Sequence, residues 1–302
     1  MKSTIVVVAG ATGNLGGKIV QALLDKKADV RAVVRLGTSD QKVRDLELMG
    51  ASVVEVDMQN VAAIAAACSN ASCVVSALSG LRDVIIDTQK LLLDGALKAG
   101  VPRFIPSDFC LDFTPFEPGE NRNLDWRREF HLYLDSAPIA ATSIFNGAFM
   151  ELLTGDMPLI LYGQKRILFW GEKAHRMPFT TIADTAEYTA NAAIDSTTPR
   201  YLRVAGDQRS PMEFKLIMTK ITGNKFRLFR AGNKHVLSIL IRIAKVFAPG
   251  KGELYPAFQG MQYMRNMIDN RSDLNDADSN RYHTQWTSIS DYLQKYFTIA
   301  PE

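Results

Sequence analysis

The sequence predicts an α/β protein, built on a doubly wound parallel sheet with a smaller C-terminal α+β part. Three observations support this prediction. An apolar run ends in glycines, strand and helix patterns alternate along the first half of the chain, and this regular alternation stops after about residue 150. A short β-branched run bounded by glycine is typical of a strand buried in a parallel sheet. Repeated strand–helix units with short connections then imply a doubly wound sheet.

The elements follow in order along the chain. The predicted strands are 4–9, 29–34, 52–56, 72–76, 103–106 and 140–145, and the helices between them are 15–24, 39–49, 62–67 and 84–99. Later segments are predicted as a hairpin (159–171), a helix (182–193), a strand (201–204) and a mainly helical remainder. We therefore expect a larger α/β domain over 1–150, to which 180–205 return, and a smaller cap domain over 151–302.

Composition excludes several classes of protein. The 302 residues carry 35 Lys and Arg against 32 Asp and Glu, without a long basic run, so we expect no nucleic-acid partner. Cys68, Cys73 and Cys110 follow no metal or disulfide spacing, and we expect buried thiols, no metal and a cytoplasmic location.

The most apolar later segment is Val236–Phe247. Arg242 and Lys245 interrupt it, which favours a packed helix, and the apolar start of the chain is too short for a signal core or a membrane span. We therefore expect no membrane association.

The first strand leads directly into Gly10-Ala-Thr-Gly13-Asn-Leu-Gly16, and helical spacing resumes at Leu15. Strand, glycine turn and helix are the context of a Rossmann dinucleotide site, where glycines admit a pyrophosphate to the helix N-terminus. Tight strand-to-helix turns also use glycine without any ligand. The position at the end of a clean strand favours nucleotide binding.

The residue after the second strand indicates which nicotinamide cofactor fits. NAD-specific sheets usually place a carboxylate there, whereas this chain has Arg35, with Lys42 and Arg44 on the next helix. A guanidinium can fork onto a 2′-phosphate, so we predict NADP(H). The alternative is a solvated arginine at a strand end.

Two further strand ends supply candidate contacts. Asp57 and Met58 would flank adenine, although Asp57 could equally cap the next helix. Ser76 and Leu78 follow the fourth strand and would pass beneath the pyrophosphate and the nicotinamide ribose, or they simply form a turn.

Short-chain dehydrogenases normally carry the pair Tyr-x-x-x-Lys, in which the tyrosine donates a proton to the substrate. This pair is absent from the sequence. None of the nine tyrosines has Lys four positions later, and Tyr162 comes nearest, with Arg166.

Together, the glycine motif, Arg35, Ala99-Gly-Val-Pro-Arg-Phe-Ile-Pro-Ser-Asp-Phe109 and Asn146-Gly-Ala-Phe149 resemble the NmrA-like/isoflavone reductase-like family of atypical short-chain dehydrogenases. The resemblance implies an NADP-binding Rossmann domain, a C-terminal cap and a cleft between them. Plant members reduce aromatic and phenylpropanoid compounds with NADPH, bacterial relatives reduce quinones or dyes, and other members are non-catalytic redox sensors.

The resemblance also implies roles for individual residues. Gly10, Thr12, Gly13, Asn14 and Leu15 would hold the pyrophosphate, Arg35 the 2′-phosphate, and Ser107–Phe109 with Phe145 and Asn146 the nicotinamide end.

The chain departs from the plant reductases at the catalytic lysine before strand 6. No lysine occurs between Asn121 and Ser136, where Arg127 or Arg128 could hold ribose or a substrate oxygen. Arginine stays protonated and cannot act as a general acid. The remaining candidate donors are Tyr133, His131, His175 and water, while Asp108 could orient a neighbour or cap a segment.

We therefore expect an NADPH-dependent reductase of an aromatic, phenylpropanoid-like or quinone-like small molecule. The alternative is a non-catalytic NADP(H) sensor that acts through a protein partner, and an isomerase that retains its cofactor is weaker. The sequence leaves open whether the protein is a homodimer.

Overall fold

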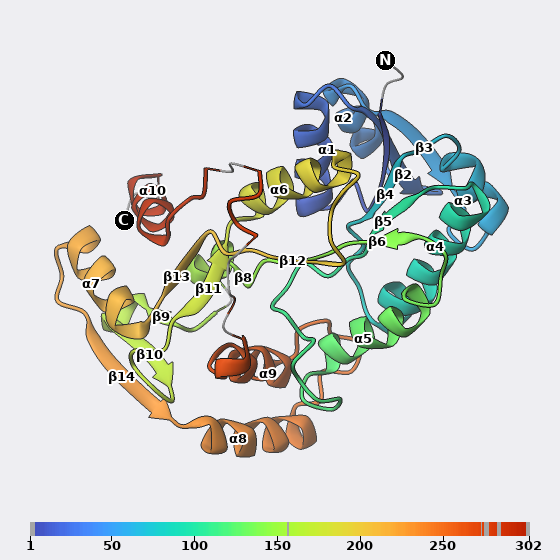
Figure 1. The fold of residues 1–302 in the computed structure, drawn as a ribbon. Coiled ribbons are helices and arrows are strands. Elements are labelled where there is room, and N and C mark those ends of the chain that lie inside the picture. Colours follow the sequence, from blue (N-terminus) through green and yellow to red (C-terminus); the bar gives the residue numbers. More distant parts are fainter. Residues whose placement is uncertain (1–3, 156, 273, 275–277, 283–284, 300–302) are drawn as a thin grey trace.

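The computed structural model describes residues 4–155, 157–272, 274, 278–282 and 285–299. Its larger part is a six-stranded sheet with the order β3-β2-β1-β4-β5-β6, in which every neighbouring pair is parallel (Figure 1). The strands are β1 (Ile5–Ala9), β2 (Asp29–Arg35), β3 (Ser52–Val56), β4 (Cys73–Ser76), β5 (Arg103–Ile105) and β6 (Ala140–Ala141). The chain winds outward from β1 in both directions, which confirms the predicted doubly wound sheet.

Helices cover both faces of this sheet. They are α1 (Asn14–Asp25), α2 (Asp40–Met49), α3 (Val61–Ala67), α4 (Gln89–Lys98), α5 (Arg122–Leu134) and α6 (Ile182–Ile194), and a π-helix, η1 (Asp83–Thr88), precedes α4. Side chains alternate between the faces along β1. Val6 and Val8 join a buried cluster with α1 and α6, whereas Val7 and Ala9 join a second cluster with α3, α4 and α5.

The predicted strand 140–145 divides into two. The Thr142 N–H donates to the Phe104 carbonyl at 3.0 Å, whereas the Ser143 N–H donates to the Arg200 carbonyl at 2.9 Å. The hydrogen-bond partner therefore changes at this point, and β7 (Ser143–Phe145) pairs in parallel with β12 (Tyr201–Arg203). Segment 180–205 thus supplies α6 and β12 beside the main sheet, and the domain division at residue 150 stays a prediction.

The smaller part contains two three-stranded sheets, β14-β10-β9 and β13-β11-β8. Their strands are β8 (Ala148–Phe149), β9 (Ile160–Leu161), β10 (Arg166–Trp170), β11 (Met177–Thr180), β13 (Asp207–Arg209) and β14 (Arg227–Gly232). The helices are α7 (Pro211–Thr222), α8 (Lys234–Phe247), α9 (Ala257–Met267) and α10 (Ile289–Ile299), with 3-10 turns η2 (Met150–Thr154), η3 (Tyr162–Gln164) and η4 (Asn270–Ser272).

Two expectations for this part have different outcomes. The predicted hairpin is confirmed, because β9 and β10 are antiparallel. The prediction that the remainder is mainly helical is incomplete, because the remainder also contains strand β14. This strand pairs in parallel with β10, about sixty residues earlier, and a local sequence pattern cannot reveal such a distant pairing.

The segment predicted to be a packed helix forms α8, but only Leu237 and Ile241 are buried in it. The prediction is therefore wrong for most of its apolar side chains, which are exposed. Within the described ranges, no helix combines the length and the apolar character needed to cross a membrane.

The three cysteines are free and buried, as predicted. Burial raises the pKa of Cys68 to about 11 and the pKa values of Cys73 and Cys110 to about 12. Such thiols stay protonated and unreactive at neutral pH.

Two helical glycines provide a test of the packing at the first turn. A Cβ on Gly16 would lie 2.1 Å from the Gly10 carbonyl oxygen, whereas a Cβ on exposed Gly260 would meet no heavy atom within 4 Å. We expect Gly16→Ala to lower the free energy of unfolding by about 1–3 kcal/mol through overpacking. Gly260→Ala should raise it by about 0.5–1 kcal/mol through helix propensity. Urea denaturation would measure both, and equal effects would contradict the close approach.

Candidate active site

Strand register brings most of the predicted cofactor residues to one edge of the sheet. Ala9 lies level with Val33 on one side and Ser76 on the other, and Val75 pairs with Ile105. The predicted cofactor residues therefore lie at the carboxyl ends of adjacent parallel strands: Arg35 and Ser76 are the last residues of β2 and β4, and Asp57, Leu78 and Ser107 follow within two residues of β3, β4 and β5. Ligands of open α/β sheets bind at this edge.

The glycine turn presents a bare helix N-terminus at this edge. Gly10 adopts φ +83°, and a Cβ there would lie 2.5 Å from the Ala77 carbonyl oxygen, so only glycine fits. Gly13 is the N-cap of α1, without a side-chain cap and without an acidic residue in the first turn. Thr12 and Asn14 are exposed and Leu15 is half-buried. Free N–H groups and the helix dipole make this turn suited to an anion such as pyrophosphate.

Arg35 is the last residue of β2. It lies two positions after Val33, which pairs with Ala9 at the end of β1. Its side chain is exposed, and it forms no ion pair with any carboxylate in the described part of the chain. The Thr38 hydroxyl donates to the Arg35 carbonyl at 2.7 Å and fixes the backbone there. The guanidinium is thus available to an external anion.

The structure decides one alternative at the end of β3. Asn60, rather than Asp57, is the N-cap of α3, and its side chain accepts from two backbone N–H groups. Asp57 accepts the Gln59 N–H at 2.9 Å and stays exposed. Met58 is buried in the cluster with α3 and α4. The helix-cap interpretation of Asp57 is therefore wrong.

Three buried polar atoms in this region have no partner among the described residues: the Ser76 hydroxyl and both amide atoms of Asn146. Such groups are costly unless a ligand or water satisfies them. Together with the glycine turn, they fit a dinucleotide that lies along the strand ends. Phe145 is different, because it stacks on Tyr201 at 5.7 Å and meets Phe113 edge-on, inside the core.

Ser107 ties two loops of the site together. Its hydroxyl donates to the Leu78 carbonyl at 2.6 Å, and its N–H donates to Gln89 Oε1 at 2.8 Å. Gln89 is fully buried at the end of the π-helix η1. A π-turn changes the face that a residue presents, and such turns are frequent at functional sites. The loops after β4 and β5 are thereby held in register.

Neighbouring arginines on α5 do different things. Arg127 donates from Nε to the Ser107 carbonyl at 3.1 Å and from Nη1 to the Asn123 carbonyl at 3.0 Å. Its Nη2 has no hydrogen bond to a described residue. Arg128 instead donates to the Phe113 and Phe116 carbonyls at 2.8 and 2.6 Å. Arg128 therefore holds the preceding loop.

His131 belongs to a buried network rather than to an open site. Its Nε2 lies 2.6 Å from Asp108 Oδ2, and the Ser143 hydroxyl donates to the same oxygen at 2.7 Å. Arg200 donates to the Ser143 hydroxyl at 2.6 Å and lies 3.3 Å from His131 Nδ1. In a Ser-His-Asp triad the two ring nitrogens face Ser and Asp separately, whereas here one nitrogen faces both. The arrangement stabilises the core and does not activate the serine.

Burial would raise the pKa of Asp108, but His131, Ser143 and Arg127 hold it below its usual range. Asp108 is therefore ionised at neutral pH and is the charged centre of the network.

The other predicted donors lie apart from Arg127. The Tyr133 hydroxyl donates to Asp94 on α4 at 2.6 Å, and this hydrogen bond, with burial, raises the Tyr133 pKa. Tyr133 also lies on a different side of α5 from Arg127, because six residues at 100° each place the two positions about 120° apart around the helix. His175 Nε2 lies 2.9 Å from the Met267 carbonyl oxygen, in the smaller part.

Sequence reasoning missed Tyr263, on α9. Burial raises its pKa, and the positive charge of Arg127 opposes this rise. Tyr263 is thus a half-buried phenol within electrostatic range of Arg127. Only the folding of α9 against α5 brings the two together, and no spacing in the sequence signals it.

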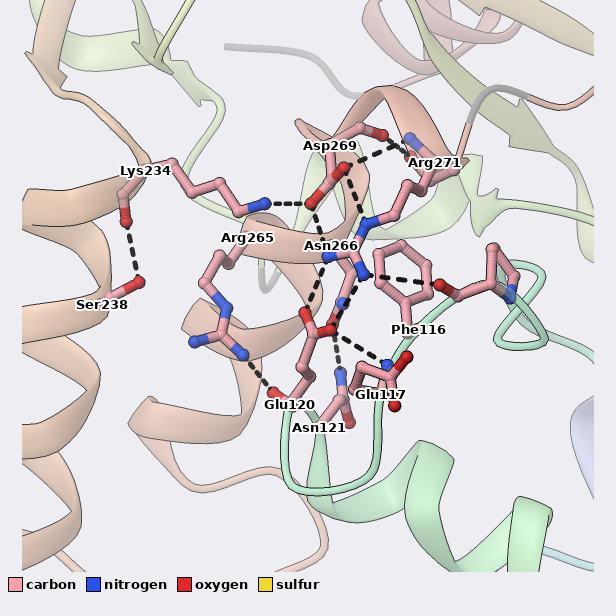
Figure 2. Close-up of polar contacts among 12 residues, drawn as sticks. Phe116, Glu117, Glu120, Asn121, Lys234, Ser238, Arg265, Asn266, Asp269 and Arg271 are labelled. Atoms are coloured by element: carbon pink, nitrogen blue, oxygen red, sulfur yellow. Dashed lines mark hydrogen bonds and ion pairs between the residues drawn. The ribbon is translucent and has the colours of Figure 1, made fainter.

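The smaller part is fastened over the start of α5. Asn121 is the α5 N-cap, and its amide donates to Asn266 Oδ1 at 3.1 Å while Gln259 donates to Asn121 Oδ1 at 2.6 Å. Figure 2 shows the adjoining ion pairs, in which Arg271 bridges Glu120 at 3.0 Å and Asp269 at 2.8 Å, and Lys234 also pairs with Asp269. These bonds set α9 against the Arg127 end of the site.

A metal centre finds no support in the part of the chain that is described, where no three His, Cys, Asp or Glu side chains gather.

The parallel sheet, the glycine turn and the bare N-terminus of α1 define a Rossmann-type α/β protein. Within that class, the chain belongs to the NmrA-like family, whose profile matches residues 1–293. Pinoresinol reductase 1 of Arabidopsis thaliana is 25% identical, over 98% of each chain. This membership confirms the resemblance found in the sequence.

Solved structures share the fold. AtPrR2 with NADP+ and (+)-pinoresinol superposes with a TM-score of 0.80 at 22% identity, over 98% of this chain and 99% of that one. An isoflavone reductase gives 0.79 at 16% identity, over 98% and 100%. An NADPH-dependent quinone oxidoreductase of Escherichia coli gives 0.74 at 17% identity, over 97% and 99%.

The Asp108 network predicts a specific pH dependence. A carboxyl whose pKa is lowered by folding stabilises the protein above its unfolded pKa, and this stabilisation is lost as pH falls through the folded value. Asp108→Asn should therefore be less stable than the wild type by about 1–3 kcal/mol at neutral pH. The gap should close below about pH 4. Urea denaturation between neutral and acidic pH would measure it, and a gap independent of pH would contradict an ionised Asp108.

Proposed function

We propose that this protein is an NADPH-dependent reductase that transfers a hydride to an aromatic, phenylpropanoid-like or quinone-like small molecule. The observation that carries the proposal is the bare N-terminus of α1 beside an unpaired, exposed Arg35. An anion-binding turn and a free guanidinium at adjacent strand ends suit the pyrophosphate and the 2′-phosphate of one dinucleotide.

The residues of the site divide the work of holding this cofactor, which supplies the hydride when bound. The first turn of α1 binds the pyrophosphate, and Arg35 binds the 2′-phosphate. Ser76 and Asn146 offer buried, unpaired polar atoms to the ribose and the nicotinamide end. Ser107 fixes the loop that carries Leu78, and its carbonyl accepts a hydrogen bond from Arg127 on α5.

Arg127 is the residue that we propose to contact the substrate. Its Nη2 carries a permanent positive charge, which stabilises negative charge developing on a substrate oxygen as the hydride arrives. The proton comes from water or from Tyr263, since Tyr133 and His131 are engaged with Asp94 and Asp108.

The names of the relatives support a reductase over a sensor. They include pinoresinol reductases among the curated proteins and a quinone oxidoreductase among the solved structures. Both substrate classes are planar or aromatic, which fits the expectation from the sequence.

The proposal is tested by following NADPH absorbance in the presence of quinones, triarylmethane dyes, aromatic aldehydes and lignans such as pinoresinol. Turnover with one class would establish the activity and name the acceptor. Tight NADPH binding by calorimetry with no turnover across the panel would overturn it in favour of a sensor.

Arg35 should distinguish the two nicotinamide cofactors. Arg35→Ala removes a charged hydrogen-bond donor to the 2′-phosphate, and we expect NADPH binding to weaken by about 1.5–3 kcal/mol. NADH lacks this phosphate, so its affinity should barely change. Calorimetric titration of both cofactors measures the difference, and equal losses would remove Arg35 from the site.

Arg127 and Arg128 form a matched pair for testing the substrate contact. Arg127→Ala should lower kcat/KM by roughly 10- to 150-fold, the equivalent of one charged hydrogen bond. Both variants free backbone carbonyls, Ser107 in the first and Phe113 and Phe116 in Arg128→Ala, so both should lower the melting temperature, but only Arg127→Ala should lower kcat/KM. Unchanged turnover in the folded Arg127 variant would show that this residue does not contact substrate.

A further inference from the structure

Helix α8 presents an apolar face that nothing in the described chain covers. Figure 1 shows α8 at the outer edge of the smaller part, next to α9. Its inner face buries Leu237 and Ile241. The exposed apolar residues of α8 are Val236, Ile239, Leu240, Ile243, Val246 and Phe247, the last two with exposures of 71% and 82%.

These side chains form one continuous stripe. At 100° per residue, positions 236, 240, 243 and 247 fall along one line of the helix, and 239 and 246 fall beside it. Arg242 and His235 flank the stripe on the side away from the buried face. A helix with a long apolar stripe and a narrow basic flank has the pattern of helices that lie in a membrane interface.

The segment that contains α8 carries basic side chains only. Residues 214–252, between Glu213 and Glu253, hold nine of the chain's 35 Lys and Arg and none of its 32 Asp and Glu. Lys234 pairs with Asp269, and Lys245 lies over the Phe258 ring at 5.6 Å. Among the described residues, Arg227, Arg230, Arg242 and Lys251 make no ion pair, so their charge is available to an outside partner.

We infer that α8 and its basic surroundings form a docking surface for anionic lipid membranes, on which the protein lies without crossing the bilayer. Charge complementarity selects this occupant. A second copy related by a two-fold axis would bring the basic flanks of the two α8 helices to the same side of the interface, which is unfavourable. An anionic leaflet instead offers negative headgroups to the basic flank and hydrocarbon to the stripe. The inference stands independently of the proposed reductase activity.

Vesicle flotation tests the surface directly. The full-length protein is mixed with vesicles of phosphatidylcholine alone, or of phosphatidylcholine with phosphatidylserine, and the fraction that floats is measured. We expect binding to the anionic vesicles only, and weaker binding as salt is raised.

Two sets of variants separate the stripe from the charge. V246D/F247D should lower the partition coefficient at least about tenfold, because both side chains would enter the interface. R242Q and K251Q should each lower it about fivefold. The matched control is L48D/L132D, which changes two leucines of similar exposure (85% and 75%) on α2 and α5 and should bind as the wild type does. All six substituted side chains are exposed, so the variants should fold, which circular dichroism checks.

The remaining outcomes overturn the inference. Failure of the wild type to float with anionic vesicles would exclude the membrane. Equal loss in the control would show that the stripe is not the contact. A dimer in analytical ultracentrifugation that V246D/F247D dissociates would assign the stripe to a second copy of the chain.

Discussion

The site depends on one close approach of backbone to backbone, at the end of β1. Gly10 lies against the Ala77 carbonyl in the loop after β4, and Gly16 lies against the Gly10 carbonyl. Neither position has room for a Cβ. Because both contacts involve main chain, they aim the first turn of α1 at the strand ends whatever the surrounding side chains are. The geometry of the glycine turn is therefore a consequence of packing between β1, β4 and α1.

Polar groups behind this turn have two distinct roles. Asp108, His131, Ser143 and Arg200 bond to one another and hold β7 and α5 in place, with Asp108 Oδ1 left unpaired among the described residues. The Ser76 hydroxyl and both amide atoms of Asn146 are buried and have no partner at all there. A protein interior tolerates unpaired polar atoms mainly where something else completes them. The contrast is the reason why Ser76 and Asn146, rather than the Asp108 network, enter the proposed cofactor site.

Much of the larger part could be predicted from the sequence, because its signals are local. Apolar runs, glycines and helical spacing give the strands from β1 to β5 and the glycine turn, and Arg35 follows from its position after a strand. The rest depends on contacts between distant residues. The change of hydrogen-bond partner at Thr142, the pairing of β14 with β10 and the place of Tyr263 beside α5 all arise from such contacts. The exposure of α8 was missed for the same reason, because an apolar pattern states that a face is apolar but not what covers it.

The N-cap of α5 has a consequence for how this fold can be taken apart. Asn121 holds the first N–H groups of the helix that carries Arg127, and residues of α9 complete the hydrogen bonds of the same side chain. The two parts of the protein thus share a helix terminus rather than a simple surface. The smaller part therefore cannot be exchanged as an independent unit. A chimera that exchanged the smaller part for that of a relative would need to carry residues 117–123 with it, or the first turn of α5 would fray and release the arginine it supports.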